Sequence, residues 1–117
     1  MRISFLLDFY GSMLTQKQRE VIEFYYNDDL SLSEIAENEG ITRQGVRDAI
    51  KRAESQLLEM EDRLGFAGRY REEREGLARI TAEADRIIDF NGRFSNVQEI
   101  SESARKISSI AQRLSSQ

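Results

Sequence analysis

Three residues with hydrogen-bonding side chains, Gln44, Arg47 and Lys51, recur at spacings of three and four residues after Thr42. If the segment is a helix with Val46 at the centre of its buried side, a rotation of 100° per residue places all three on the outer side. Arginine can bind guanine through two hydrogen bonds, and glutamine can bind adenine in the same way. These three residues are therefore our candidates for contact with DNA bases.

Other residues of the same segment suit the phosphate backbone better. Arg43 and Arg52 flank the outer side and carry charges that attract phosphate. Thr42 is a good residue to begin a helix, and the first turn after it offers free backbone N–H groups to a phosphate. Asp48 also lies on the outer side, where it would repel phosphate unless it accepts a hydrogen bond from a cytosine amino group.

The segment from Ser31 to Ile50 predicts two short helices joined by a tight turn, which would position these side chains. Ser31 and Glu34 have the S-x-x-E spacing of a capping box at the start of the first helix. Gly40 suits a helix end, because glycine reaches the left-handed conformation without steric cost. A helix of about eight residues, a glycine turn and a second helix form the helix-turn-helix pattern.

The surrounding sequence carries a family resemblance. The stretch from Leu14 to Leu57 contains LTQKQ, then SLSEIAENEGITRQGVR, followed by a helical segment DAIKRAE that carries Lys51 and Arg52. It resembles region 4 of bacterial sigma factors. With the start of the chain included, LLDFY, YYNDDLSLSEIAE and TRQGVRDAIKRAE are similar to the YlxM family of small bacterial proteins, strongly to about Leu64 and weakly beyond.

This resemblance implies an all-α fold, in which a sigma region 4-like helix-turn-helix domain carries a C-terminal helical extension. It also implies backbone contacts by Lys17 and Arg19, at the start of the helix that precedes the motif. Finally, the resemblance implies a regulatory role linked to the signal recognition particle pathway, whose components are possible partners beside the double-stranded DNA that the outer side chains predict.

The composition excludes several other kinds of protein. The 117 residues include no cysteine and no histidine, so the commonest nucleophile, general base and metal ligands are missing. The acidic residues between Asp28 and Glu39 match no metal-ligand spacing, and we expect no cofactor, no metal and no enzymatic activity. The chain lacks a long apolar run and a secretory leader, so we expect a cytoplasmic protein without membrane insertion.

The charge of the chain is unevenly distributed. The net charge is −4, which is unusual for a protein that binds nucleic acid. Residues 1–40 carry three basic and eight acidic side chains, whereas residues 41–54 carry four basic and two acidic ones. Positive charge is therefore concentrated on the second helix of the motif, where the basic patch is small.

The remaining chain predicts further helices. Thr15 and Gln18 form a second capping box, and Asn27 to Asp29 break the helix that follows. We expect two domains, residues 1–64 with the helix-turn-helix and residues 65–117 as the helical extension. Residues 77–114 have the pattern of a helical hairpin, with Phe94 packed into its turn and Asn96 capping its last helix.

One long apolar seam continues beyond the motif. It recurs at spacings of four and three through Leu57 and Met60 as far as Ala67, which indicates a partner helix. That helix would belong either to the chain's own C-terminal hairpin or to a second copy of the chain. Because helix-turn-helix proteins commonly pair to match two half-sites, we expect a homodimer.

A second function remains open at this point. Ala36, Gly40 and Val46 specify how two helices pack, and this packing requires no DNA. With a net acidic chain and a small basic patch, the same motif would also suit an adaptor that binds protein or ribonucleoprotein of the targeting machinery. A partner that survives nuclease treatment would distinguish this adaptor from a DNA-binding protein.

Overall fold

The computed structural model describes residues 2–117, and this part of the chain contains helices and no strand. Its helices are α1 (Ile3–Tyr10), α2 (Gln16–Tyr26), α3 (Leu32–Glu39), α4 (Arg43–Leu64), α5 (Phe66–Phe90) and α6 (Gln98–Ser115). The all-α class predicted from the sequence is confirmed. Contacts between helices divide the chain into two units, residues 1–68 and 69–117.

Two of the predicted helix starts are capping boxes. The Thr15 hydroxyl accepts a hydrogen bond from the Gln18 N–H at 3.2 Å, and the Gln18 side chain accepts one from the Thr15 N–H at 3.1 Å. Ser31 and Glu34 repeat this arrangement, with both distances 3.1 Å. Both pairs satisfy backbone donors that the first turn of a helix otherwise leaves free.

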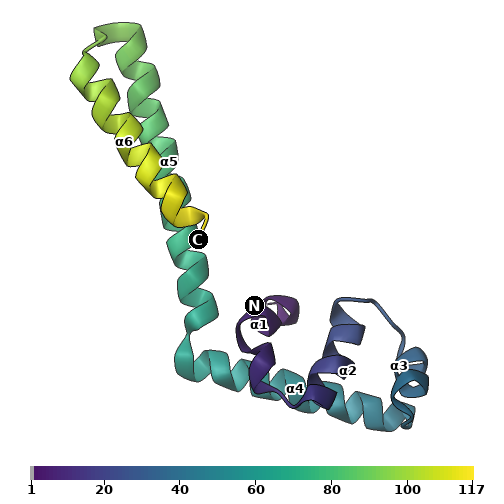
Figure 1. Ribbon diagram of the computed structural model, residues 1–117. Coiled ribbons are helices and arrows are strands. Elements are labelled where there is room, and N and C mark those ends of the chain that lie inside the picture. The colour runs from purple at the N-terminus through teal and green to yellow at the C-terminus, as the bar shows by residue number, and fades with distance from the viewer. Residues whose placement is uncertain (1) are drawn as a thin grey trace. The chain divides into compact units, whose positions relative to one another are not determined.

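In the first unit, α1, α2 and α3 pack along one side of the long helix α4 (Figure 1). Two clusters of buried side chains hold them there. One joins α1 and α2 to the second half of α4, and the other joins α2 and α3 to its first half. The core of this unit is therefore a continuous apolar strip on α4.

The apolar seam on α4 has a partner that we did not anticipate. Leu57 is fully buried together with Leu6 and Tyr10 of α1, and Met60 packs at the edge of the same cluster. Neither the C-terminal hairpin nor a second copy is needed to cover it. The seam through Leu57 and Met60 belongs to the core of the first unit, so the expectation that it packs on the hairpin or on a second chain was wrong.

At the end of α4, a carboxylate collects three hydrogen bonds. Gly65 ends the helix in the left-handed conformation, with φ 66°. The Glu61 side chain then accepts hydrogen bonds from the Tyr10 hydroxyl at 2.6 Å, the Ala67 N–H at 3.0 Å and the Gly68 N–H at 2.9 Å. Glu61 thereby caps the first turn of α5 and ties it to α1 and α4.

The second unit is a hairpin in which α5 and α6 run side by side in opposite directions (Figure 1). The turn differs from our expectation. Asn96 does not cap α6, because it adopts the left-handed conformation with φ 52°, and Val97 is the residue that precedes the helix. Phe94 does not pack into the turn either: it is 71% exposed and contacts the ring of Phe90.

Asn91 holds the turn instead. Its buried side-chain amide donates to the Val97 carbonyl at 2.6 Å and to the Ser101 hydroxyl at 2.7 Å, while its oxygen accepts from the Val97 N–H at 3.1 Å. The side chain thus bonds to both backbone groups of Val97, the residue that precedes α6. A local capping pattern could not reveal this role, because Asn91 lies six residues before Val97.

We expect Asn91→Ala to destabilise the hairpin by about 2–4 kcal/mol, since it removes the acceptor of the Val97 N–H and the donor to the Ser101 hydroxyl in a partly buried turn. Thermal unfolding followed by circular dichroism would measure the loss. The control is Asn96→Gly, which removes a side chain from a left-handed position and should cost less than about 1 kcal/mol. Equal stability of the Asn91→Ala variant and the wild type would contradict the role of this side chain.

Candidate nucleic-acid interface

The helix-turn-helix is formed by α3 and α4. Gly40 ends α3 in the left-handed conformation with φ 68°, which turns the chain sharply. The Thr42 hydroxyl then accepts a hydrogen bond from the Gly45 N–H at 3.0 Å and starts α4. Because Ile35 of α3 and Val46 of α4 are fully buried in the same cluster, the angle between the two helices is set by packing.

Gly45 lies in the first turn of α4, where glycine costs helix stability. A Cβ atom at this position would lie 3.3 Å from the Thr42 hydroxyl oxygen and 3.6 Å from a methyl group of Ile41. A larger residue would therefore crowd the hydroxyl that caps the helix. This close approach gives a structural reason for the glycine that the sequence pattern did not supply.

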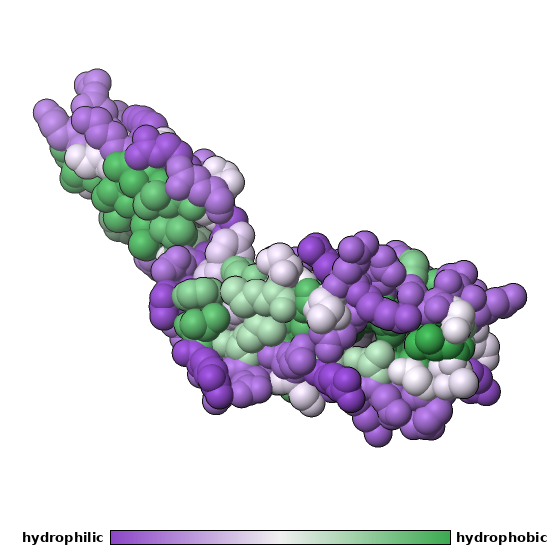
Figure 2. All heavy atoms as spheres, turned by 60° about the horizontal axis from the view of Figure 1, so that its bottom comes forward, coloured by the Kyte–Doolittle hydropathy of each residue, from purple (hydrophilic) through white to green (hydrophobic). Residues whose placement is uncertain are grey.

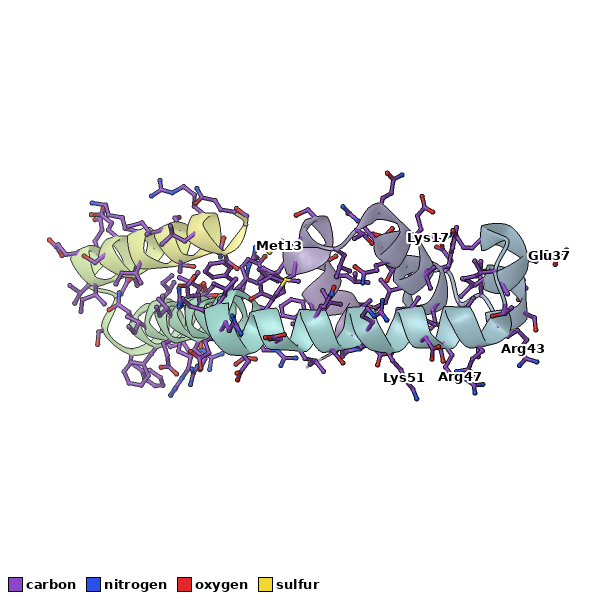
Figure 3. All side chains as sticks on the ribbon, turned by 90° about the horizontal axis from the view of Figure 1, so that it is seen from below. Met13, Lys17, Glu37, Arg43, Arg47 and Lys51 are labelled. Carbon is purple, nitrogen blue, oxygen red and sulfur yellow. The ribbon has the colours of Figure 1, made fainter. Side chains whose placement is uncertain are left out.

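The outer side of α4 carries a row of basic side chains. Arg43, Arg47 and Lys51 are exposed and project from the same side of the helix, away from α1, α2 and α3 (Figure 3). Within residues 2–117, none of the three forms an ion pair. Their charged groups are therefore available to an anionic partner without the loss of an internal contact.

Gln44 and Asp48 occupy the neighbouring row. Both are exposed, and the Gln44 amide donates a hydrogen bond to the Asp48 carboxylate at 3.0 Å. A base contact by Gln44 would have to replace this bond. The bond also occupies one oxygen of Asp48, the acidic group that stands in the middle of the outer face.

Arg52 lies on the other flank of this face. It is exposed and is about 140° around the helix from Arg47, as five residues at 100° each require. Basic groups on two flanks of one helix suit the two phosphate walls of a groove. Thr42 is exposed as well, at the N-terminal end of the same helix.

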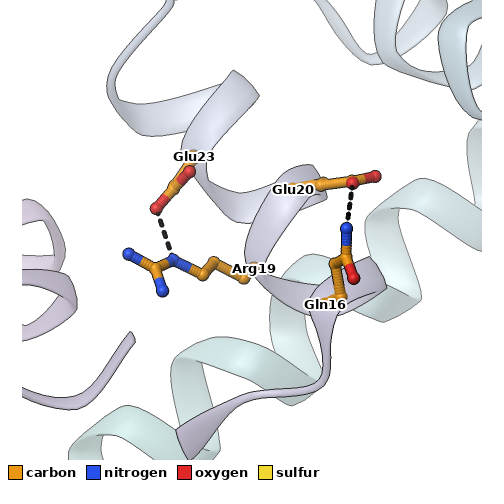
Figure 4. A network of polar contacts seen from close by, with 4 residues as sticks. All are labelled: Gln16, Arg19, Glu20 and Glu23. Atoms are coloured by element: carbon orange, nitrogen blue, oxygen red, sulfur yellow. Dashed lines mark hydrogen bonds and ion pairs between the residues drawn. The ribbon is translucent and has the colours of Figure 1, made fainter. Parts of the chain in front are cut away.

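The two basic residues of α2 are placed differently. Lys17 lies on the other side of α4 from the basic row (Figure 3). The Arg19 guanidinium pairs with the Glu23 carboxylate at 2.8 Å, beside a hydrogen bond of 3.3 Å between Gln16 and Glu20 (Figure 4). Arg19 would have to leave this pair to reach a phosphate, so it is less available than the residues of α4.

Lys17 lies near an acidic side chain, Glu39. The pKa of the Glu39 carboxyl is raised. Partial burial is the largest cause and repulsion by Glu20 the next, whereas attraction to Lys17 lowers the same pKa. Lys17 is therefore close enough to the Glu39 carboxylate to offset part of its charge. The structure does not bring Lys17 and Arg19 into one patch with Arg47.

None of the helices within residues 2–117 has the length and apolar character that a membrane span requires.

The geometry of α3, the Gly40 turn and α4 defines a helix-turn-helix protein. A family profile described as "Putative helix-turn-helix protein, YlxM / p13 like" matches residues 1–97. The chain belongs to this family, UPF0122, as the resemblance to YlxM proteins predicted.

Several curated relatives carry only the family name. A UPF0122 protein of Desulforamulus reducens is 46% identical over 79 residues, which cover 68% of each chain. One from Bacillus thuringiensis is 48% identical over 79 residues, covering 68% of this chain and 72% of the relative. One from Thermoanaerobacter is 53% identical over 70 residues, or 60% of each chain.

Proposed function

We propose that this protein is a cytoplasmic, non-enzymatic regulator that binds double-stranded DNA with α4 in the major groove. The observation that carries the proposal is the row of Arg43, Arg47 and Lys51, which are exposed, unpaired within the described residues and located on the second helix of a helix-turn-helix. In such motifs the second helix reads base edges, and flanking residues contact phosphate.

The proposal gives the residues two roles. Gln44, Arg47 and Lys51 contact bases, while Thr42, Arg43 and Arg52 contact phosphates near the same helix. Lys17 and Arg19 are secondary phosphate contacts, because their present neighbours are carboxylates. The proposal also includes a homodimer, which would bind two half-sites, and the link to the signal recognition particle pathway that the family resemblance implies.

The phosphate part of this proposal predicts a particular salt dependence. Each lost phosphate contact should reduce the slope of log affinity against log salt concentration by about 0.9. Arg43→Ala should therefore weaken binding uniformly across DNA sequences and make the slope shallower by about this amount. Fluorescence anisotropy of labelled duplexes at several salt concentrations would measure both effects.

The matched control is Lys106→Ala, which removes an exposed positive charge from the hairpin unit. This variant has the same change in net charge and should keep the wild-type slope. If the slope of Arg43→Ala equalled that of the wild type, Arg43 would not contact phosphate. Equal losses in the two variants would instead indicate a general effect of net charge.

A second candidate function is an adaptor for protein or ribonucleoprotein of the targeting machinery. Asp48 favours the adaptor, because its carboxylate lies in the outer face of α4, where it repels phosphate. The hydrogen bond from Gln44 holds this carboxylate in place. The net charge of −4 acts in the same direction. Capture of partners from a bacterial lysate, with and without nuclease, would separate the two functions, since a protein partner survives digestion.

A further inference from the structure

The seam between the two helices of the hairpin is made of small side chains. Ala84 of α5 and Ala104, Ser108 and Ala111 of α6 are its buried residues. Small residues let two helices approach closely, and they leave no room for large side chains between the helices. The large apolar residues of α5 and α6 must therefore lie beside the seam.

These large residues gather on one side of the hairpin, which we call the apolar face (Figure 2). Ile87 and Ile107 line the same shallow depression, and Ile80 and Leu114 line another. Each of these four side chains is 44–47% exposed. The large apolar side chains that line these depressions and their continuations along the hairpin are Ile80, Ile87, Phe90, Ile100, Ile107 and Leu114.

The other side of the hairpin is polar. There the Ser108 hydroxyl donates a hydrogen bond to Asp85 at 3.3 Å, and Ser101 accepts one from Asn91 at 2.7 Å. Within residues 69–117, no element covers the apolar face. Only one side of the hairpin therefore needs a partner, and that partner must be apolar over the length of both helices.

We propose that a second copy of this chain covers the apolar face, so that two hairpins pack face to face as a four-helix bundle. At roughly 100 Å² for each half-exposed Ile, Leu or Phe side chain, the six residues expose about 600 Å². Two copies would remove about 1,200 Å² from water, which reaches the range of stable protein interfaces. A patch of this size is at the upper limit for monomeric proteins.

The charge of the hairpin also fits a second copy. Residues 69–117 carry nine basic and eight acidic side chains, so two copies meet without strong repulsion. A near-neutral surface offers no electrostatic attraction to a strongly charged partner.

The architecture of the hairpin fits a four-helix bundle. Such bundles bury one face of every helix around a common core, and short turns connect their antiparallel neighbours. This inference deepens the homodimer part of the proposed function and rests on that part alone.

The test is the mass of the full chain in solution, measured by light scattering or sedimentation from micromolar to hundred-micromolar concentration. The wild type should have twice the 13.5 kDa mass of one chain. The double variant Ile87→Glu, Ile107→Glu should raise the dissociation constant of the dimer roughly 100-fold, because it places carboxylates in the apolar interface.

The matched control is the double variant Ala82→Glu, Ser109→Glu. It adds the same charge to the same two helices at exposed residues, on the far side by helical geometry. This control should remain a dimer. A monomeric wild type would overturn the inference, as would a dimeric face variant or a control pair that dissociates as readily as the face variant.

If the face variant loses its helical circular dichroism, cross-linking replaces it. The chain has no cysteine, so Ile107→Cys introduces a single thiol on the apolar face. A short bis-maleimide should join two such chains but should not join Ser109→Cys chains. Absence of the product with Ile107→Cys would overturn the inference. These measurements contain no DNA, so failure to bind DNA would affect only the proposed function.

Discussion

Glu61→Ala is expected to lower the free energy of unfolding by about 3–5 kcal/mol. The substitution leaves the Tyr10 hydroxyl and the N–H groups of Ala67 and Gly68 without the oxygen atoms that now accept their hydrogen bonds. These groups are partly buried, and water can replace the carboxylate only in part. Denaturant unfolding followed by circular dichroism would measure the loss.

Glu59→Ala is the matched control, because Glu59 belongs to the same helix and has the same chemistry. Its carboxylate pairs with Arg63 at 2.8 Å, but both side chains are more than half exposed. Exposed pairs contribute less than about 1 kcal/mol, so this variant should unfold almost as the wild type does. Similar losses for the two variants would contradict the special role of Glu61.

The same cluster predicts how stability depends on pH. The hydrogen bond from Tyr10 is the largest of several contacts that hold the pKa of the Glu61 carboxyl below its usual value. Because the folded pKa is lowered, the stabilisation by Glu61 is complete above the unfolded value of 4.5 and is lost as pH falls through the lowered pKa. Glu61→Gln should therefore flatten the acid limb of a plot of stability against pH.

At alkaline pH, stability should fall because of groups whose pKa is raised in the folded protein. Burial, followed by a hydrogen bond to Glu54, raises the pKa of Tyr26 to about 12, and burial also raises the pKa of Tyr10. Since unfolded tyrosine ionises near 10, stability should fall as pH rises from there through the raised values. Tyr26→Phe should reduce this loss, and an unchanged alkaline limb would contradict the assignment.

Arg47→Ala is expected to weaken binding to the preferred DNA sequence by about 1–3 kcal/mol, or roughly 5- to 150-fold, and to relax the preference at one base pair. The side chain is exposed and forms no ion pair within the described residues, so its removal should leave helicity and stability unchanged. Anisotropy titrations against the preferred duplex and its single-base variants would measure both effects.

Arg63→Ala is the control for this substitution. Arg63 is an exposed arginine near the other end of α4, and it should leave DNA affinity unchanged. If Arg47→Ala bound the preferred duplex as tightly as the wild type, the assignment of Arg47 to a base would fail. A loss that was equal on every sequence would instead move Arg47 to the phosphate contacts.

Features encoded over a few residues could be predicted from the sequence. Thr15 with Gln18 and Ser31 with Glu34 are capping boxes, and Gly40 is left-handed, because these properties depend on spacings of three residues or on a single backbone angle. The exposure of Arg47 and Lys51 also followed from helical periodicity alone. Whether these residues contact DNA stays a prediction.

Features that join distant residues could not be predicted in this way. Tyr10 and Glu61 are 51 residues apart, and no spacing rule connects them. The apolar repeat indicated correctly that Leu57 has a partner helix, but the repeat is equally compatible with α1, the hairpin or a second copy. In the hairpin, the buried Asn91 side chain holds the turn through contacts with Val97 and Ser101, and Phe94 is exposed, so the expectation that Phe94 packs into the turn was wrong.

The most direct test of the central claim is selection from a pool of random duplex DNA by the purified protein, repeated across salt concentrations. We predict enrichment of a defined sequence that Arg47→Ala no longer selects, with half-sites about one helical turn apart if the protein binds as a dimer. Weak, unselective binding that disappears as salt rises would contradict it. The outer face of α4 would then be a docking surface for another macromolecule.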